Sequence, residues 1–204
     1  MGESDDIDSL ALLALIAGWR NDGPALTPAG TAPARPWVFP VPMLGDRVAE
    51  ISDGWASPRK LPNGARIRHL GADIMFRRLT RSDLVDVYRP GTVNGDRWYF
   101  MPDDMPALAA GAGVVHFARR THVGFSVVIR HPKRGWATYY THLSSLSVSP
   151  GDPVNAGQPI GIIGGNPADP LPLKHLHFEI WRHGTRASAI DPRPTSICGH
   201  TSRS

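Results

Sequence analysis

The stretch His175-Leu176-His177-Phe178-Glu179-Ile180 decides how the rest of the chain is interpreted. Polar and apolar residues alternate in it, which is the pattern of a half-buried β-strand. In such a strand the two histidines and the glutamate share one face, while the three apolar side chains pack into a core. A sheet fixes the separation of the two imidazoles before any metal ion binds. The stretch therefore predicts a strand that can contribute to a metal site.

The composition is that of a folded chain with many turns. The 204 residues are 41% hydrophobic and 20% charged, so the chain can bury a core. The 21 glycines and 20 prolines separate short apolar segments, which favours a mostly β fold with an antiparallel core. A net charge of +4 favours an anionic partner. Because the sequence has no zinc-finger spacing, RNA-recognition motif or basic helix, we expect no nucleic-acid partner.

Several strands can be placed from their flanking turns. Pro62-Asn63-Gly64 predicts a hairpin turn before residues 66–69. Residues 125–130 and 137–143 are expected to form a second hairpin, and residues 37–42 a short strand that begins the globular part.

The chain is expected to divide into three parts. Residues 1–36 should form a short helix (about residues 8–20) and a Pro-rich linker. Residues 37–194 should form the main domain, with an inserted loop at 78–105, and residues 195–204 a loose tail.

A second set of polar residues lies far upstream of the first stretch. His69, Gly71 and Asp73 should share one face of an extended segment, and the glycine leaves space for a metal or a substrate. A hydrolytic zinc site needs three protein ligands and one open position. His69, Asp73 and His177 would meet that need, with zinc as the cofactor, in a groove of the β core.

Two further histidines would then be left beside the metal. His142 and His175 could exchange protons with the attacking water and the leaving amine. By contrast, we expect His131 to be structural, because it lies where a strand meets a turn, and we expect Glu179 to make a structural hydrogen bond.

These motifs resemble those of the lysostaphin-type (LytM-like) zinc endopeptidases of peptidoglycan, which are His-x(3)-Asp near the start and His-x-His near the end. Residues 140–143 (Tyr-Thr-His-Leu) are similar to the family's Tyr-x-His-Leu segment. Residues 151–161 are similar to its Gly-Asp-x-Val-x-x-Gly-Gln-x-Ile-Gly run, and the resemblance covers about residues 37–194.

The resemblance implies a zinc-dependent endopeptidase that cleaves peptide or cross-bridge bonds of bacterial peptidoglycan. It implies zinc ligation by His69, Asp73 and His177, and action of His142 and His175 on the water and the tetrahedral intermediate. The loops at 78–105 and 165–174 depart from the family pattern, so the substrate-binding residues stay unknown. Two alternatives remain open: a non-catalytic structural or regulatory protein on the same fold, and a metallopeptidase that acts on proteins.

The N-terminal part bears on how such an enzyme reaches its substrate. The apolar run at 10–18 is too short to span a bilayer, and it follows acidic residues with no lysine or arginine before it. We therefore expect no export signal and no transmembrane segment. The expectation is a protein made in the cytoplasm that acts at the cell wall, as a phage lysin or virion component. Residues 8–20 would bind a virion or envelope protein.

Overall fold

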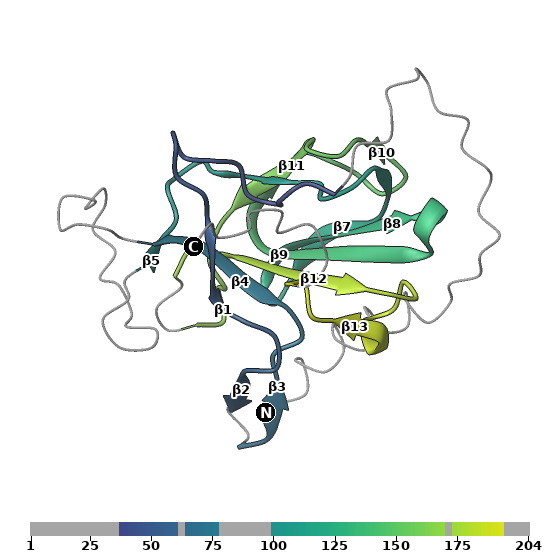
Figure 1. Ribbon diagram of the computed structural model, residues 1–204. Helices are drawn as coiled ribbons and strands as arrows, with labels where there is room; N and C mark the ends of the chain where they lie inside the picture. The colour runs from purple at the N-terminus through teal and green to yellow at the C-terminus, as the bar shows by residue number, and fades with distance from the viewer. Residues whose placement is uncertain (1–36, 61–63, 78–98, 170–172, 194–204) are drawn as a thin grey trace, which may run out of the picture.

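The computed structural model describes residues 37–60, 64–77, 99–169 and 173–193 (Figure 1). Within these ranges the secondary structure consists of β-strands and two short 3-10 helices, η1 (Pro132–Arg134) and η2 (Arg186–Ser188). The predicted mostly β, antiparallel fold is therefore confirmed. The predicted N-terminal helix, its linker and the C-terminal tail lie outside the described residues. In the described part of the chain, no helix has the length and apolar character needed to cross a membrane.

One antiparallel sheet forms the body of the molecule. Its main order is β1 (Glu50–Asp53), β4 (Ala72–Arg77), β12 (Leu176–Trp181), β9 (Trp136–Leu146), β8 (Gly124–His131), β7 (Gly113–Thr121) and β10 (Pro153–Val154). Shorter strands extend it: β5 (Tyr99–Phe100) pairs with β4, β13 (Ala189–Ile190) with β12, and β11 (Pro159–Ile163) with both β9 and β6 (Pro106–Leu108).

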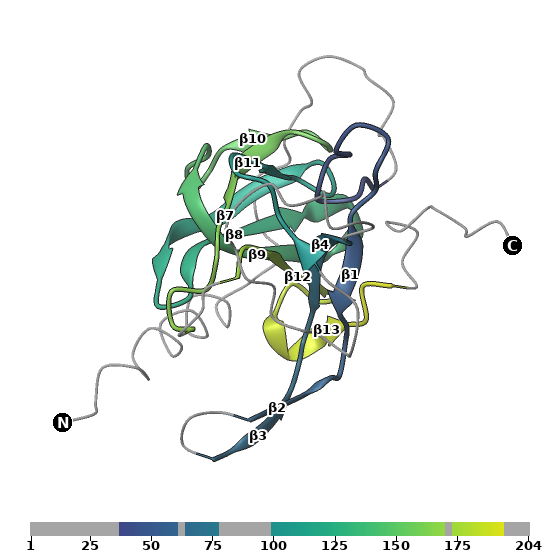
Figure 2. The same cartoon turned by 90° about the vertical axis from the view of Figure 1, so that its left-hand side faces the viewer.

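A separate two-stranded hairpin precedes β4. It is formed by β2 (Pro58–Lys60) and β3 (Arg66–Arg68), and it extends away from the body of the sheet (Figures 1 and 2). The turn predicted at residues 62–64 lies between these strands, so the predicted hairpin is present, although residues 61–63 themselves lie outside the described part.

Strand β12 is central in the sheet and is buried on both faces. Leu176, Phe178 and Ile180 belong to the main hydrophobic core, as the alternation predicts. The opposite face is also covered, because Glu179 and Trp181 are fully buried. The prediction of a half-buried strand is thus wrong in one respect. The polar face is also buried, and its side chains make hydrogen bonds within the protein.

Two segments differ from the sequence-based expectations. Residues 37–42 form no strand, although Val38 N donates to Ala110 O at 2.8 Å and Leu108 N donates to Pro40 O at 2.8 Å. Prolines at 40 and 42 have no N–H to donate, so a continuous ladder cannot form there. Residues 99–105, the end of the predicted inserted loop, contribute β5 and two buried methionines to the body of the fold.

Candidate metal centre

The sheet register brings the distant sequence motifs together. In the pairing of β4 with β12, Asp73 lies directly opposite His177. Directly paired residues of an antiparallel sheet point to the same face, with Cβ atoms about 4.5–5.5 Å apart. His69 lies three residues before β4 and is buried beside them. A hydrogen-bonded register therefore fixes the relative positions of residues more than a hundred positions apart.

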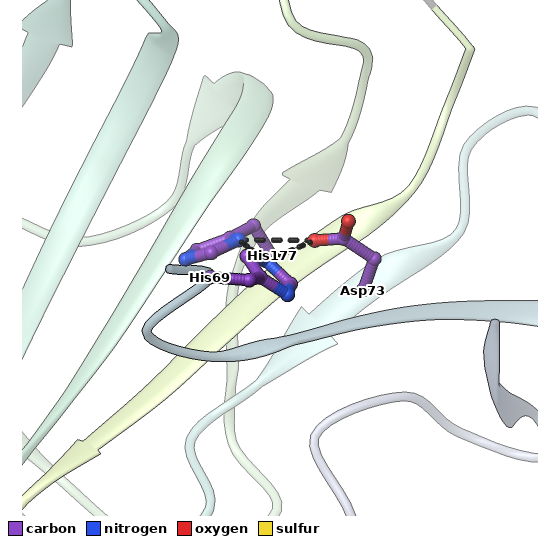
Figure 3. Close-up of side chains that lie close together, drawn as sticks. All are labelled: His69, Asp73 and His177. Atoms are coloured by element: carbon purple, nitrogen blue, oxygen red, sulfur yellow. Dashed lines mark hydrogen bonds and ion pairs between the residues drawn. The ribbon is translucent and has the colours of Figure 1, made fainter. Parts of the chain in front are cut away.

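The three side chains converge on one point (Figure 3). His69 Nε2 lies 2.9 Å from His177 Nδ1. Asp73 Oδ1 lies 3.2 Å from His69 Nε2 and 3.0 Å from His177 Nδ1. Donor atoms around a tetrahedral zinc with bonds of roughly 2.0–2.1 Å are about 3.3 Å apart, so these separations are close to those of a zinc site.

The outer nitrogens of both rings already have acceptors. His69 Nδ1 donates to Gly54 O at 2.9 Å, and His177 Nε2 donates to Glu179 Oε1 at 2.9 Å. In the neutral ring, a nitrogen that donates leaves the other nitrogen with a free lone pair. When both rings are neutral, two imidazole lone pairs and a carboxylate oxygen face one another within hydrogen-bond distance, and either a proton or a metal ion between them stabilises this arrangement.

The local charges favour a cation at the same point. Burial would raise the pKa of Asp73, but hydrogen bonds from His177 and His69 outweigh it and hold that pKa well below its usual value. Burial would lower the pKa of His177, but hydrogen bonds with Asp73 and Glu179 raise it to about 9. The two carboxylates that favour a proton on His177 would equally favour a metal ion beside it.

Glu179 is a buried carboxylate with three donors. Besides His177, it accepts from Trp181 Nε1 at 2.7 Å and from Arg186 Nη2 at 3.0 Å. The expected structural hydrogen bond is present, and its partner is a candidate metal ligand. Carboxylates in this position fix the tautomer and orientation of a ligating histidine and raise its basicity.

We expect the Glu179→Gln variant to bind zinc about 10–100-fold more weakly. Glutamine keeps the shape of the side chain but removes the charge that orients His177 and pairs with Arg186. Competition with a chelator of known affinity measures the change. Glu50→Gln, at an exposed position of β1, is the control and should bind zinc as the wild type does. Equal affinities in the two variants would contradict this role.

His142 and His175 lie beside the three-residue cluster. Their ring centroids are 4.6 Å apart, and His175 Nε2 is 3.8 Å from Asp73 Oδ1. Each Nδ1 donates to a backbone carbonyl: His142 to Val123 O at 2.8 Å and His175 to Leu173 O at 2.7 Å. Both rings are therefore oriented, and each neutral ring keeps a lone pair on Nε2.

The backbone of His142 is held in a conformation that non-glycine residues rarely adopt. Its φ is +67°, in the left-handed region. Such strain persists only where the surroundings enforce it, and it is concentrated at functional sites. Burial, with the nearby His175 and His177, lowers the pKa of the His142 ring to about 3, so the ring is neutral at pH 7.

Gly71 is required by the close packing of the site. A Cβ atom there would lie 2.4 Å from Phe178 O, 2.9 Å from Glu179 Cγ and 3.0 Å from His177 Nε2. Glycine is therefore needed for the close approach of β12, whereas the prediction was that it leaves space for a metal or a substrate.

We expect Gly71→Ala to lower the free energy of unfolding by about 1–3 kcal/mol, because the added methyl group must displace backbone and a candidate ligand. Chemical denaturation measures this change. Gly54→Ala is the matched control, since its Cβ would meet no atom closer than 3.7 Å. If both variants unfold at the same denaturant concentration, the packing argument is wrong.

Comparison with known proteins finds a family match for part of the chain. Residues 98–192 match peptidase family M23. This range, a little under half of the chain, is therefore similar to M23 peptidases. The matched range includes His142, His175 and His177, whereas His69 and Asp73 precede it. The pairing of β4 with β12 brings Asp73, which lies upstream of the matched range, next to His177, which lies within it.

Similar proteins include peptidases and other proteins. The chain is 37% identical over 93 residues to the uncharacterized lipoprotein YgeR of Escherichia coli, covering 45% of this chain and 34% of that one, so it spans about a third of that relative's length. A zinc-containing peptidase from Vibrio cholerae is 25% identical, with a TM-score of 0.54 over 78% of this chain and 39% of that one.

Two further solved structures share the fold. The antimicrobial peptidase lysostaphin from Staphylococcus simulans aligns with a TM-score of 0.56 at 21% identity, covering 82% of this chain and 58% of that chain. The SpoIIQ–SpoIIIAH pore-forming complex aligns with a TM-score of 0.55 at 22% identity, covering 78% of this chain and 90% of that chain. The family match and the His69, Asp73 and His177 donor set are both typical of metallopeptidases.

Proposed function

We propose that this protein is a zinc-dependent endopeptidase that cleaves peptide or cross-bridge bonds of bacterial peptidoglycan. The observation that carries the proposal is the convergence of His69 Nε2, His177 Nδ1 and Asp73 Oδ1 within 3.2 Å of one another, on rings whose outer nitrogens are already bonded. The fold shared with lysostaphin, an antimicrobial peptidase, supports the choice of a cell-wall substrate.

Zinc held by these three residues would act as a Lewis acid on the scissile carbonyl and would lower the pKa of an attacking water. The other two histidines supply proton transfer. Neutral His142 accepts the proton of the attacking water at Nε2, and His175, when it is protonated on both ring nitrogens, donates from Nε2 to the carbonyl oxygen as that oxygen gains charge. The proton then passes to the amine as the C–N bond breaks, which leaves a carboxylate and a free amino group.

A non-catalytic role on the same fold is the second candidate, because a pore-forming complex shares this architecture. All five residues that the chemistry needs are present here, which favours the enzyme. A metallopeptidase that acts on proteins would use the same five residues, so substrate assays must separate the two.

Digestion of purified sacculi from several wall types tests the proposal. Zinc-loaded protein should release fragments with new amino termini within the stem peptide or cross-bridge, identified by mass spectrometry. An unfolded protein substrate is incubated in parallel, and Asp73→Ala serves as the inactive control. If the protein substrate is cleaved and the sacculi stay intact, a peptidase that acts on proteins is favoured. If neither substrate is cleaved, the non-catalytic candidate is favoured.

We further propose that the protein acts at the cell wall as a phage lysin or virion component, anchored to a virion or envelope protein through residues 8–20. This rests on the acidic and apolar pattern of the N-terminal sequence. Deleting residues 1–30 should abolish association with virions while leaving the digestion of soluble wall fragments nearly intact. Loss of that digestion would contradict the proposed anchor.

A further inference from the structure

Residues 54–57 make several hydrogen bonds with His69, the first candidate ligand in the sequence. His69 Nδ1 donates to Gly54 O at 2.9 Å. His69 N donates to Ser57 O at 2.9 Å, and Ala56 N donates to His69 O at 2.8 Å. Residues 54–57 therefore fix both the ring and the backbone of His69. They lie outside the range that matches the M23 family.

Arg59, which follows these residues, contacts Asp73, and the two carboxylate oxygens of Asp73 have different partners. Oδ1 faces His69 Nε2 and His177 Nδ1, as described above. Oδ2 accepts a hydrogen bond from Arg59 Nη2 at 3.0 Å. One oxygen is thus directed to the candidate metal position, while the other is bound by a guanidinium.

Arg59 is itself held in place by a second carboxylate. Its Nη1 pairs with Asp53, and Asp53 accepts a hydrogen bond from Ser57 Oγ at 2.6 Å. In the hairpin, Arg59 pairs with Ile67 of β3, the strand that leads directly into His69. A planar guanidinium bridging two carboxylates is oriented by both, which a flexible ammonium group would not match.

The position of Arg59 has a consequence for coordination. A carboxylate can bind a metal ion through one oxygen or through both. A hydrolytic zinc site needs a position left open for water or substrate. If Asp73 bound through both oxygens, it would take up that position.

We propose that Arg59 is a positioning residue that keeps Asp73 Oδ2 away from the metal, so that Asp73 ligates through Oδ1 alone and one coordination position stays open. This inference rests on the proposed zinc site. Removing the guanidinium frees Oδ2 to turn toward the metal. In a variant without the guanidinium, Oδ2 would then occupy the open coordination position, so we expect zinc to stay bound and the reaction to be slower.

Arg59→Met tests the proposal, because methionine keeps most of the length of the side chain and lacks the donors. Arg66→Met is the matched control: Arg66 is exposed on the partner strand of the same hairpin and makes no ion pair with any residue in the described ranges. Arg59→Lys is the conservative variant, which keeps the charge but cannot bridge both carboxylates. Unfolding midpoints establish that each variant is folded.

The readout is coordination number and turnover. The full-length protein is loaded with Co²⁺ in place of zinc, and its visible absorption reports whether the ion has four ligands or more. We expect Arg59→Met to shift the spectrum toward higher coordination and to lower kcat about 10–100-fold on soluble wall peptides, with a smaller change in KM. Arg59→Lys should recover part of the loss, and Arg66→Met should match the wild type.

The possible failures can be told apart. If the wild type binds neither Zn²⁺ nor Co²⁺, the proposed function fails and the inference with it. If the wild type binds both ions and Arg59→Met has the spectrum and kcat of Arg66→Met, the positioning role of Arg59 is wrong while the proposed function stands. If Arg59→Met does not fold, the Arg59→Lys spectrum decides: an unchanged spectrum with unchanged kcat overturns the inference.

Discussion

The Asp73→Ala and His177→Ala variants are expected to lose zinc binding and peptidase activity together. Each substitution removes one of three protein ligands and leaves two, which is fewer than a hydrolytic zinc site uses. Since replacing partners that only orient a ligand costs about 10–100-fold in metal affinity, losing a ligand should cost more than 100-fold. Metal analysis of the purified proteins after dialysis measures the loss.

A histidine outside the cluster provides the control for this experiment. His183 is exposed just after the far end of β12, and His183→Ala should keep one zinc per chain and full activity. Undiminished zinc in Asp73→Ala and His177→Ala would contradict the ligand assignment. Both variants must be folded, and near-UV circular dichroism checks this independently of the metal.

The second large effect separates ligands from proton-transfer residues. His142→Ala and His175→Ala should each keep zinc but lose turnover by roughly 10²-fold or more. Neither ring is needed for the three-residue cluster, and each is oriented by a backbone carbonyl through Nδ1. Removing the ring therefore removes a proton acceptor or donor without removing a ligand.

Parallel measurement of metal content and kcat on soluble wall peptides tests this separation. A His142→Ala or His175→Ala protein that is metal-free at neutral pH would mean that ligands and proton-transfer residues have been exchanged. A variant that keeps both zinc and full turnover would show that the ring takes no part in the reaction.

Much of the fold and of the cluster could be predicted because local patterns determined them. The alternation from 175 to 180 correctly assigned Leu176, Phe178 and Ile180 to the core. The spacing of His69 and Asp73 predicted a shared face, and the structure brings both side chains to His177, although His69 lies before β4 and outside any strand. Such predictions succeed because the side-chain direction in a strand follows from the position in the sequence.

The surroundings of the cluster could not be predicted in the same way. Arg59 reaches Asp73 only because the hairpin pairs β2 with β3, the strand that leads into His69 and β4, and Arg186 reaches Glu179 only because η2 lies beside β12. These contacts depend on loop geometry, which leaves no periodic signal in the sequence. The burial of the polar face of β12 was missed for a related reason: most of the side chains that pack around Trp181 come from β7, β8 and β9, which are distant from β12 in the sequence.

Metal depletion followed by zinc titration tests the central claim most directly. The metal-free protein is incubated with purified sacculi while zinc is added in small portions, and new peptide amino termini are counted by mass spectrometry. The proposed mechanism predicts no release without metal, and an increase that reaches its limit at one zinc per chain in the wild type and is absent in Asp73→Ala. Equal release from the metal-free protein, or none from the zinc-loaded protein, would contradict it.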